Sequence, residues 1–211
     1  MFSWNPQRRG PMAVPRKRAA QRNAFSVKLR RWGILGGLAA AAVGLGGWAI
    51  YAVYFAKPGV AIPIQQPSDY QLRLGETVSY NSVPPTSGPY AGATTDWGIH
   101  DRPIPNEIQV HMLRLGGVLV QYRPRESPVL DDPVAEGLKR LIGRLRTENF
   151  ERYCKVIVAP YPLLPKKIAL TAWGRLDLFD AQEITPEVER RIVRFLDRLI
   201  DAYNPERAPC P

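Results

Sequence analysis

Residues that bind transition metals are scarce in this sequence. Among 211 residues, His100 and His111 are the only histidines, and Cys154 and Cys210 are the only cysteines. A zinc or copper site needs several imidazole, thiolate or carboxylate groups at about 2 Å from the ion, and no CxxC pair supplies a redox or zinc motif. We therefore predict no metal and no cofactor. The weaker alternative is a copper-type site that uses His111, His100 and Met112 with help from a cysteine.

Motifs for catalysis are equally scarce. No glycine-rich loop follows the phosphate-binding pattern, and Gly116-Gly117 are explained as a turn between strands. A nucleophilic triad would need a serine near His111 and a carboxylate such as Asp101 or Glu107, and the spacing gives this no support. We predict that the protein is not an enzyme and has no catalytic residues.

Acidic residues are absent from residues 1–31, which contain nine basic residues, whereas the rest of the chain has 20 basic and 19 acidic residues. Nine of the ten net positive charges therefore belong to the N-terminal tail. Residues 32–56 carry no charge, and as a helix they would extend about 37 Å, more than the hydrocarbon core of about 30 Å. A basic tail before an apolar span predicts a cytoplasmic tail and an extracytoplasmic C-terminal part. We predict one uncleaved transmembrane helix in the inner or plasma membrane.

Two alternatives for this N-terminal part are less favoured. Cleavage as a signal peptide near Ala39–Ala42 fits poorly, because the apolar stretch exceeds the usual length of about 7–15 residues. Nucleic-acid binding has little support, because the tail has no fold signature; we expect it to contact anionic lipid headgroups instead.

One face of the predicted span carries small residues, which let a second helix approach closely in lipid. We expect subunits that are integral membrane proteins to contact this face and the basic tail. The predicted partner-binding residues are Gly33, Gly37, Ala41, Gly44, Arg8, Arg9, Arg16 and Arg18.

A proline-containing linker at 57–69 leads to a domain at 70–211, long enough for one hydrophobic core. Alternating residues at 108–115 and 118–122 predict two strands joined by a hairpin at Gly116-Gly117. Further strands are predicted at 156–159 and 168–178. Helices are predicted to begin at Asp132-Pro133 and Thr185-Pro186, where a capping side chain precedes proline.

These elements predict an α+β domain with a mixed or antiparallel sheet and two packed helices. Their order is similar to a thioredoxin-type arrangement, although the catalytic cysteines of that arrangement are absent. An extracytoplasmic location permits a disulfide between Cys154 and Cys210. A free thiol at Cys210, between two prolines, is the alternative that the sequence leaves open.

Seven short motifs in the domain resemble one prokaryotic family, catalogued as domain of unknown function 3105. The resemblance covers about 75–208, and the proline-rich loop and the ALTAWG strand are its most specific motifs. The motifs are Tyr80-Asn81, Pro84-Pro85-Thr86-Ser87-Gly88-Pro89, Trp97-Gly98, Val110-His111-Met112-Leu113, Gly116-Gly117-Val118 with Tyr122, Ala159-Pro160-Tyr161-Pro162 and Ala169-Leu170-Thr171-Ala172-Trp173-Gly174.

The resemblance implies a membrane anchor and a group of histidines with a glutamate, similar to a metal or acid–base site. Family members show a histidine directly after the SGP of the loop and a His-x-x-Glu-His run before the Gly-Gly turn. Here the loop position is Tyr90 and the run contains His111, Arg114 and Leu115. Because arginine repels cations and leucine has no donor atom, the resemblance implies a scaffold whose site is mostly lost.

We therefore expect a non-catalytic, single-pass accessory or structural subunit of a membrane complex, with an energy-transducing assembly, respiratory or photosynthetic, as one candidate. The alternative is a membrane-tethered, extracytoplasmic metal-binding protein of the copper type.

Overall fold

The computed structural model describes residues 40–48, 51, 56–73, 75–125 and 132–210. It divides into two compact units, Met1–Ala56 and Lys57–Pro211. In the first unit, residues 40–48 are helical and exposed. Across the described residues, no helix is both long enough and apolar enough to cross a bilayer.

Most of the predicted span at 32–56 lies outside the described residues. The same holds for six of the eight predicted partner-binding residues: Gly33, Gly37, Arg8, Arg9, Arg16 and Arg18. The other two, Ala41 and Gly44, lie in the helical segment at 40–48 with their surfaces exposed.

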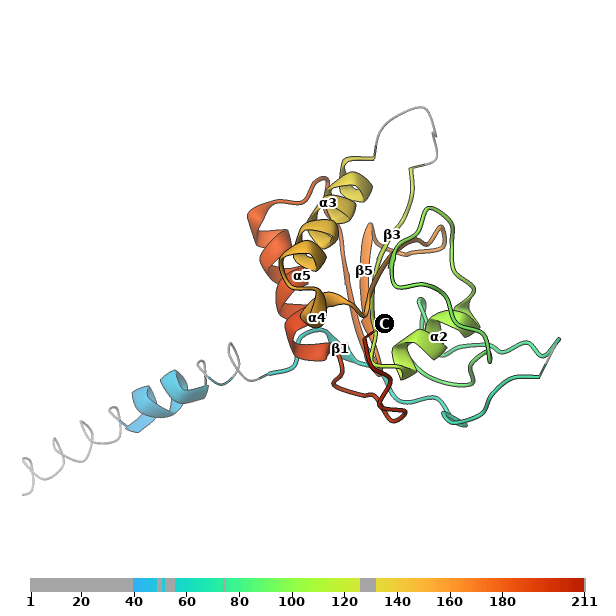
Figure 1. Cartoon of the computed structure of the whole chain (residues 1–211). Helices are drawn as coiled ribbons and strands as arrows, with labels where there is room; N and C mark the ends of the chain where they lie inside the picture. The colour runs from blue at the N-terminus through green and yellow to red at the C-terminus, as the bar shows by residue number, and fades with distance from the viewer. Residues whose placement is uncertain (1–39, 49–50, 52–55, 74, 126–131, 211) are drawn as a thin grey trace, which may run out of the picture. The chain divides into compact units, whose positions relative to one another are not determined.

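The second unit is built on a six-stranded mixed sheet (Figure 1). Across the sheet the order is β1 (Val60–Ala61), β6 (Arg175–Phe179), β5 (Ile168–Ala172), β3 (Val118–Tyr122), β4 (Val156–Pro160) and β2 (Gly98–Ile99). The pairs β3–β4 and β4–β2 are parallel, and the remaining neighbours are antiparallel. An α+β domain with a mixed sheet is therefore confirmed. Strand β1 lies within the segment that the sequence predicted to be a linker.

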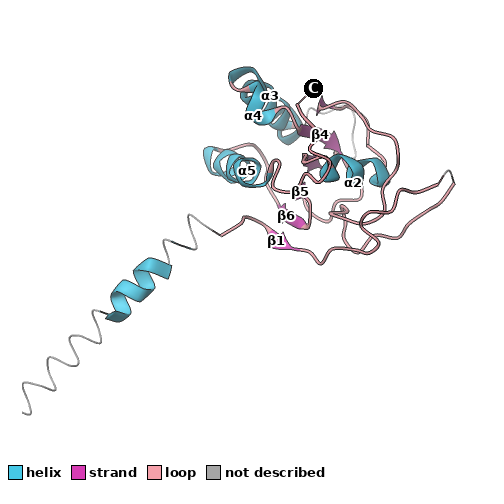
Figure 2. Cartoon of the chain, turned by 60° about the horizontal axis from the view of Figure 1, so that its bottom comes forward, coloured by secondary structure: helices cyan, strands magenta, loops and turns pink. Residues whose placement is uncertain are grey.

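Helices cover both faces of this sheet (Figure 2). Helices α3 (Pro133–Glu148), α4 (Phe150–Tyr153) and α5 (Pro186–Leu199) lie on one face, and α2 (Asn106–Arg114) lies on the other. Successive strand residues point to opposite faces, so Val118 and Val120 pack with α3 and α5, while Leu119 packs with α2. Burying both faces explains why β3 and β4 are fully buried.

The predicted start of helix α3 is confirmed. The Asp132 carboxylate accepts hydrogen bonds from the N–H groups of Val134 and Ala135, and its other oxygen lies 2.6 Å from the Lys167 ammonium. Burial alone would raise the pKa of Asp132, but Lys167 and the two N–H groups more than offset this, so the pKa is lowered. The capping carboxylate is therefore ionised at neutral pH.

The prediction of a strand at 108–115 is wrong, because this segment forms α2. Gly116, at φ +89°, ends the helix. Its N–H binds the Leu113 carbonyl, and the Gly117 N–H binds the Met112 carbonyl. This is the Schellman pattern, in which glycine supplies the left-handed residue that closes a helix. The Gly-Gly pair therefore stops a helix and does not join two strands.

The predicted strand at 168–178 is also wrong in part. It forms two strands, β5 and β6, joined at Trp173-Gly174, where Gly174 has φ +64°. The turn pairs the two strands antiparallel, so that Ile168 lies opposite Phe179 and Ala172 lies opposite Arg175. Glycine at the second turn position allows this tight connection.

Candidate functional site

A buried loop and helix α2 bring together most of the positions that the family resemblance singled out. The loop at 84–90 is buried throughout and ends at Tyr90. The Gly174 N–H donates to the Thr86 carbonyl, and the Gln65 N–H donates to the Ser87 hydroxyl. These bonds fix the loop and direct Tyr90 toward α2.

Tyr90 contacts two residues of that helix. Its ring centroid lies 4.9 Å from that of His111, and the Arg114 guanidinium carbon lies 4.9 Å from the Tyr90 centroid. Residues three and four positions apart share a face of a helix, so the helix aligns positions 111, 114 and 115. Leu115 instead packs at the edge of the apolar cluster beneath α2. The structure thus joins Tyr90, His111 and Arg114 and leaves Leu115 outside their contacts.

Arg114 is held from three sides. Besides the Tyr90 ring, it meets the Glu206 carboxylate at 2.8 Å and donates to the Ser68 carbonyl at 3.1 Å; its side chain is 14% exposed. Burial alone would lower the pKa of Arg114, but the bond to Glu206 and the nearby phenols Tyr90 and Tyr203 more than offset this, so the pKa is raised. A fixed positive charge therefore occupies the position where the family resemblance implies a glutamate.

The residues of the alternative copper-type site are not brought together. The His100 ring bonds to the Asp96 carbonyl and the His111 ring to the Ala93 carbonyl. Met112 is 1% exposed, in the apolar cluster beneath α2. Within the described ranges, no three His, Cys, Asp or Glu residues are arranged to hold a metal ion.

Two functional contacts were not predicted from the sequence. Glu206, the partner of Arg114, lies 92 residues away in the chain, and Tyr203 stacks on Trp173 with centroids 4.5 Å apart. Both come from the segment after α5: the apolar spacing of the sequence predicts Tyr203 within the last helix, but α5 ends at Leu199, and no contact of Glu206 was predicted. Their spacing in the sequence carries no signal of these contacts.

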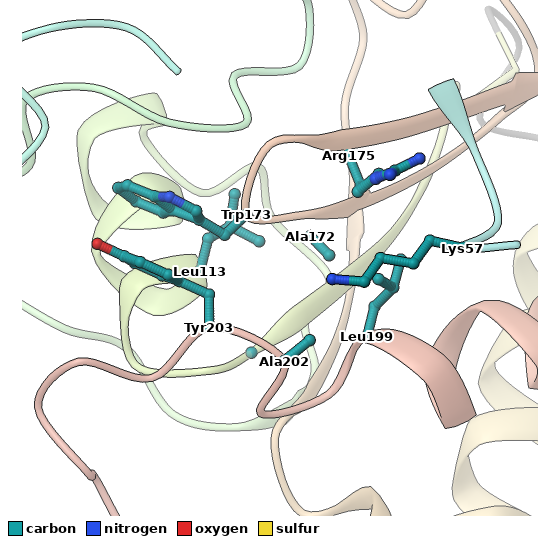
Figure 3. A pocket seen from close by; sticks show the side chains of 9 residues that line it. Lys57, Leu113, Ala172, Trp173, Arg175, Leu199, Ala202 and Tyr203 are labelled. Atoms are coloured by element: carbon teal, nitrogen blue, oxygen red, sulfur yellow. The ribbon is translucent and has the colours of Figure 1, made fainter. Parts of the chain in front are cut away.

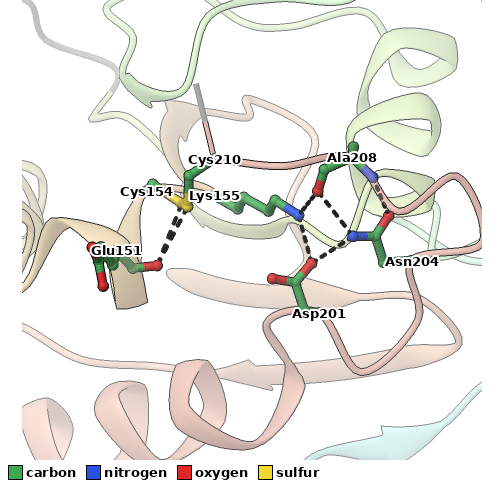
Figure 4. Close-up of polar contacts among 7 residues, drawn as sticks. All are labelled: Glu151, Cys154, Lys155, Asp201, Asn204, Ala208 and Cys210. Carbon is green, nitrogen blue, oxygen red and sulfur yellow. Dashed lines mark hydrogen bonds and ion pairs between the residues drawn. A yellow bond between two sulfur atoms is a disulfide. The ribbon is translucent and has the colours of Figure 1, made fainter.

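A group of polar contacts fastens this C-terminal segment (Figure 4). Cys154 and Cys210 form a disulfide with their Cα atoms 5.8 Å apart. The sequence left open whether Cys210 is paired or a free thiol, and the structure shows it paired. The adjacent Lys155 is 1% exposed, and its ammonium contacts the Asp201 carboxylate at 2.6 Å and the Ala208 carbonyl. These bonds hold the segment that carries Glu206 against the sheet.

The fold and this cluster define an α+β domain in which the chain's own side chains fill the candidate site. Residues 71–211 match the family described as Protein of unknown function (DUF3105), and the chain belongs to that family. The predicted resemblance is therefore confirmed. No curated protein and no solved structure matches the chain.

Proposed function

We propose that this protein is a non-catalytic accessory subunit of a membrane complex. In this proposal residues 32–56 cross the membrane once, the basic tail is cytoplasmic and the folded domain is outside. The observation that carries the proposal is the filled site: the Arg114 guanidinium lies on Tyr90 and beside Glu206. A fixed cation where the family resemblance implies a glutamate opposes both a bound metal and a carboxylate that transfers protons.

The disulfide supports the proposed location of the domain. Disulfides persist in oxidising compartments and are rare in the cytosol. The bond between Cys154 and Cys210 is accompanied by the buried Lys155 contacts, so it belongs to the packed domain. An extracytoplasmic domain after a cytoplasmic basic tail agrees with the charge distribution of the sequence.

Isolation of the full-length chain in a mild detergent, followed by mass spectrometry of the co-purifying proteins, tests the proposal. We expect integral membrane subunits to co-purify in a fixed ratio. Gly33→Leu with Gly37→Leu should reduce their recovery, because larger side chains separate packed helices in lipid. The matched control, Ala39→Leu with Ala42→Leu, places the same two leucine side chains on the opposite helix face and should leave recovery unchanged.

Recovery of the wild-type chain only as a monomer would contradict the proposal. Equal losses for both pairs of substitutions would contradict the part of it that concerns the glycine face. The metal-binding alternative predicts a different result: uptake of copper by the full-length chain, reduced on changing His111. The disulfide already occupies both thiols, so no specific observation favours that alternative.

A further inference from the structure

A pocket of about 180 Å³ lies at the end of the sheet where β5 turns into β6 (Figure 3). Its apolar lining includes Leu113 from α2, Ala172 from β5 and Leu199 from α5. These side chains are 1%, 2% and 4% exposed, so they belong to the fixed interior of the domain. The pocket therefore has a rigid apolar base formed by three elements.

An aromatic pair forms one wall of this pocket. The rings of Trp173 and Tyr203 stack with centroids 4.5 Å apart and planes 9° apart. Tyr203 lies in the segment that Lys155 and the disulfide fasten to the sheet. The wall is consequently held in place before any ligand arrives, which lowers the entropic cost of binding.

Two cations also line the pocket. Lys57 extends toward the space between Ala172 and Leu199 (Figure 3). Arg175 donates one bond to the Gly59 carbonyl at 3.2 Å. The lining contains no acidic residue, and none of the ion pairs between described residues involves Lys57 or Arg175. The pocket therefore offers positive charge beside an apolar base.

We propose that this pocket binds a small anion whose carboxylate or phosphate is attached to an apolar group of about the size of a benzene ring. A cavity of about 150 Å³ lined by apolar side chains is large enough for benzene, and this pocket is slightly larger. Lys57 and Arg175 supply charge-assisted hydrogen bonds to the anionic oxygens. The ligand is either a soluble amphiphilic acid or an anionic lipid, and the proposal does not depend on the accessory-subunit function.

Calorimetric titration of the full-length chain in a nonionic detergent with benzoate tests the chemistry. We expect saturable binding of benzoate and at least about tenfold weaker binding of benzamide, because the neutral amide cannot form charge-assisted bonds to the cations. Lys57→Gln should weaken benzoate binding by about tenfold, since it removes one charged donor. The control, Lys166→Gln, removes a lysine that pairs with Asp180 and should change nothing.

Arg175→Gln should have an effect similar to that of Lys57→Gln, with circular dichroism to establish that the variant is folded. Lys57 is exposed, so its substitution keeps the test informative if Arg175→Gln unfolds. Benzamide binding as tightly as benzoate, or Lys57→Gln binding like the wild type, would overturn the proposal.

Native mass spectrometry of the same detergent-solubilised chain separates the two sources of ligand. Retention of phosphatidylglycerol over phosphatidylcholine, lost in Lys57→Gln, supports the proposal with a lipid as the source. Benzoate binding without lipid retention supports it with a soluble acid as the source. If the chain neither binds benzoate nor retains the anionic lipid selectively, the proposed anion site is refuted.

Discussion

The ion pair between buried Lys155 and half-exposed Asp201 leads to a prediction in which the two partners behave unequally. The Lys155 side chain is 2% exposed, whereas that of Asp201 is 49% exposed and also accepts a bond from the Asn204 amide. Removing the carboxylate therefore leaves a buried ammonium without its counter-charge. Removing the ammonium leaves a carboxylate that water and Asn204 still solvate.

The magnitudes follow from this difference in exposure. Asp201→Asn keeps a side chain that tolerates the observed φ of 56°, and it should lower the free energy of unfolding by about 3 kcal/mol, near the lower end for a broken buried pair. Lys155→Met fills the same space without charge and should cost about 1 kcal/mol or less, because Asn204 still donates to the Ala208 carbonyl.

Equilibrium urea unfolding of the full-length chain in oxidising detergent buffer, followed by circular dichroism, measures both values. With a slope of about 2 kcal/mol per molar urea, Asp201→Asn should lower the midpoint by about 1.5 M and Lys155→Met by about 0.5 M or less. The double variant should resemble Lys155→Met, since no buried charge remains. A larger loss for Lys155→Met than for Asp201→Asn would refute this reasoning.

Three further predictions concern the same domain. Cys210→Ser opens a disulfide that joins residues 56 positions apart and should lower the free energy of unfolding by about 4 kcal/mol at 25 °C. The urea midpoint should fall, and chemical reduction of the wild type should reproduce the fall; an unchanged midpoint would contradict this prediction. Because the pKa of Asp132 is lowered, the free energy of unfolding of the wild type should fall as the pH drops below about 4. It should fall less for Asp132→Asn, and equal falls in the two proteins would exclude Asp132 as the cause. Tyr90→His with Arg114→Glu places an imidazole and a carboxylate beside His111, the ligand types that the family resemblance implies, and should create zinc binding measurable by calorimetry, with the wild type as control; a folded variant that takes up no zinc would show that this helix face is not a metal site.

The helices and strands that were predicted correctly carry local signals. Helices α3 and α5 begin where a capping side chain precedes a proline. The side chains of Asp132 and Thr185 accept hydrogen bonds from backbone N–H groups of the first helical turn. Strand β4 is a short apolar run that ends at Pro160. In each case, neighbouring residues in the sequence determine the element.

The error at α2 has a different origin. Residues 109–113 are all buried, polar Gln109 and His111 included, so the alternation that predicted a strand does not separate an exposed face from a buried one. Gly116-Gly117 fits a hairpin turn and a helix end equally well when only the sequence is known. The alternation and the glycines that follow it therefore did not decide between helix and strand.

The candidate site was predictable only in part. The motifs located Tyr90, His111 and Arg114 by family position, and the structure brings these three into contact. The partners Glu206 and Ser68 lie 92 and 46 positions from Arg114, and nothing in the local sequence specifies such pairings. Tertiary packing, rather than pattern, selects them.

The fastened C-terminal segment also imposes an order of assembly. Glu206 and Cys210 follow all the described helices and strands of the domain, so the ribosome makes the sheet and its helices before it makes the residues that close the cluster. Oxidation of Cys154 must wait for Cys210, and disulfide formation takes seconds to hours. During synthesis Arg114 is therefore present without its carboxylate partner until the segment closes.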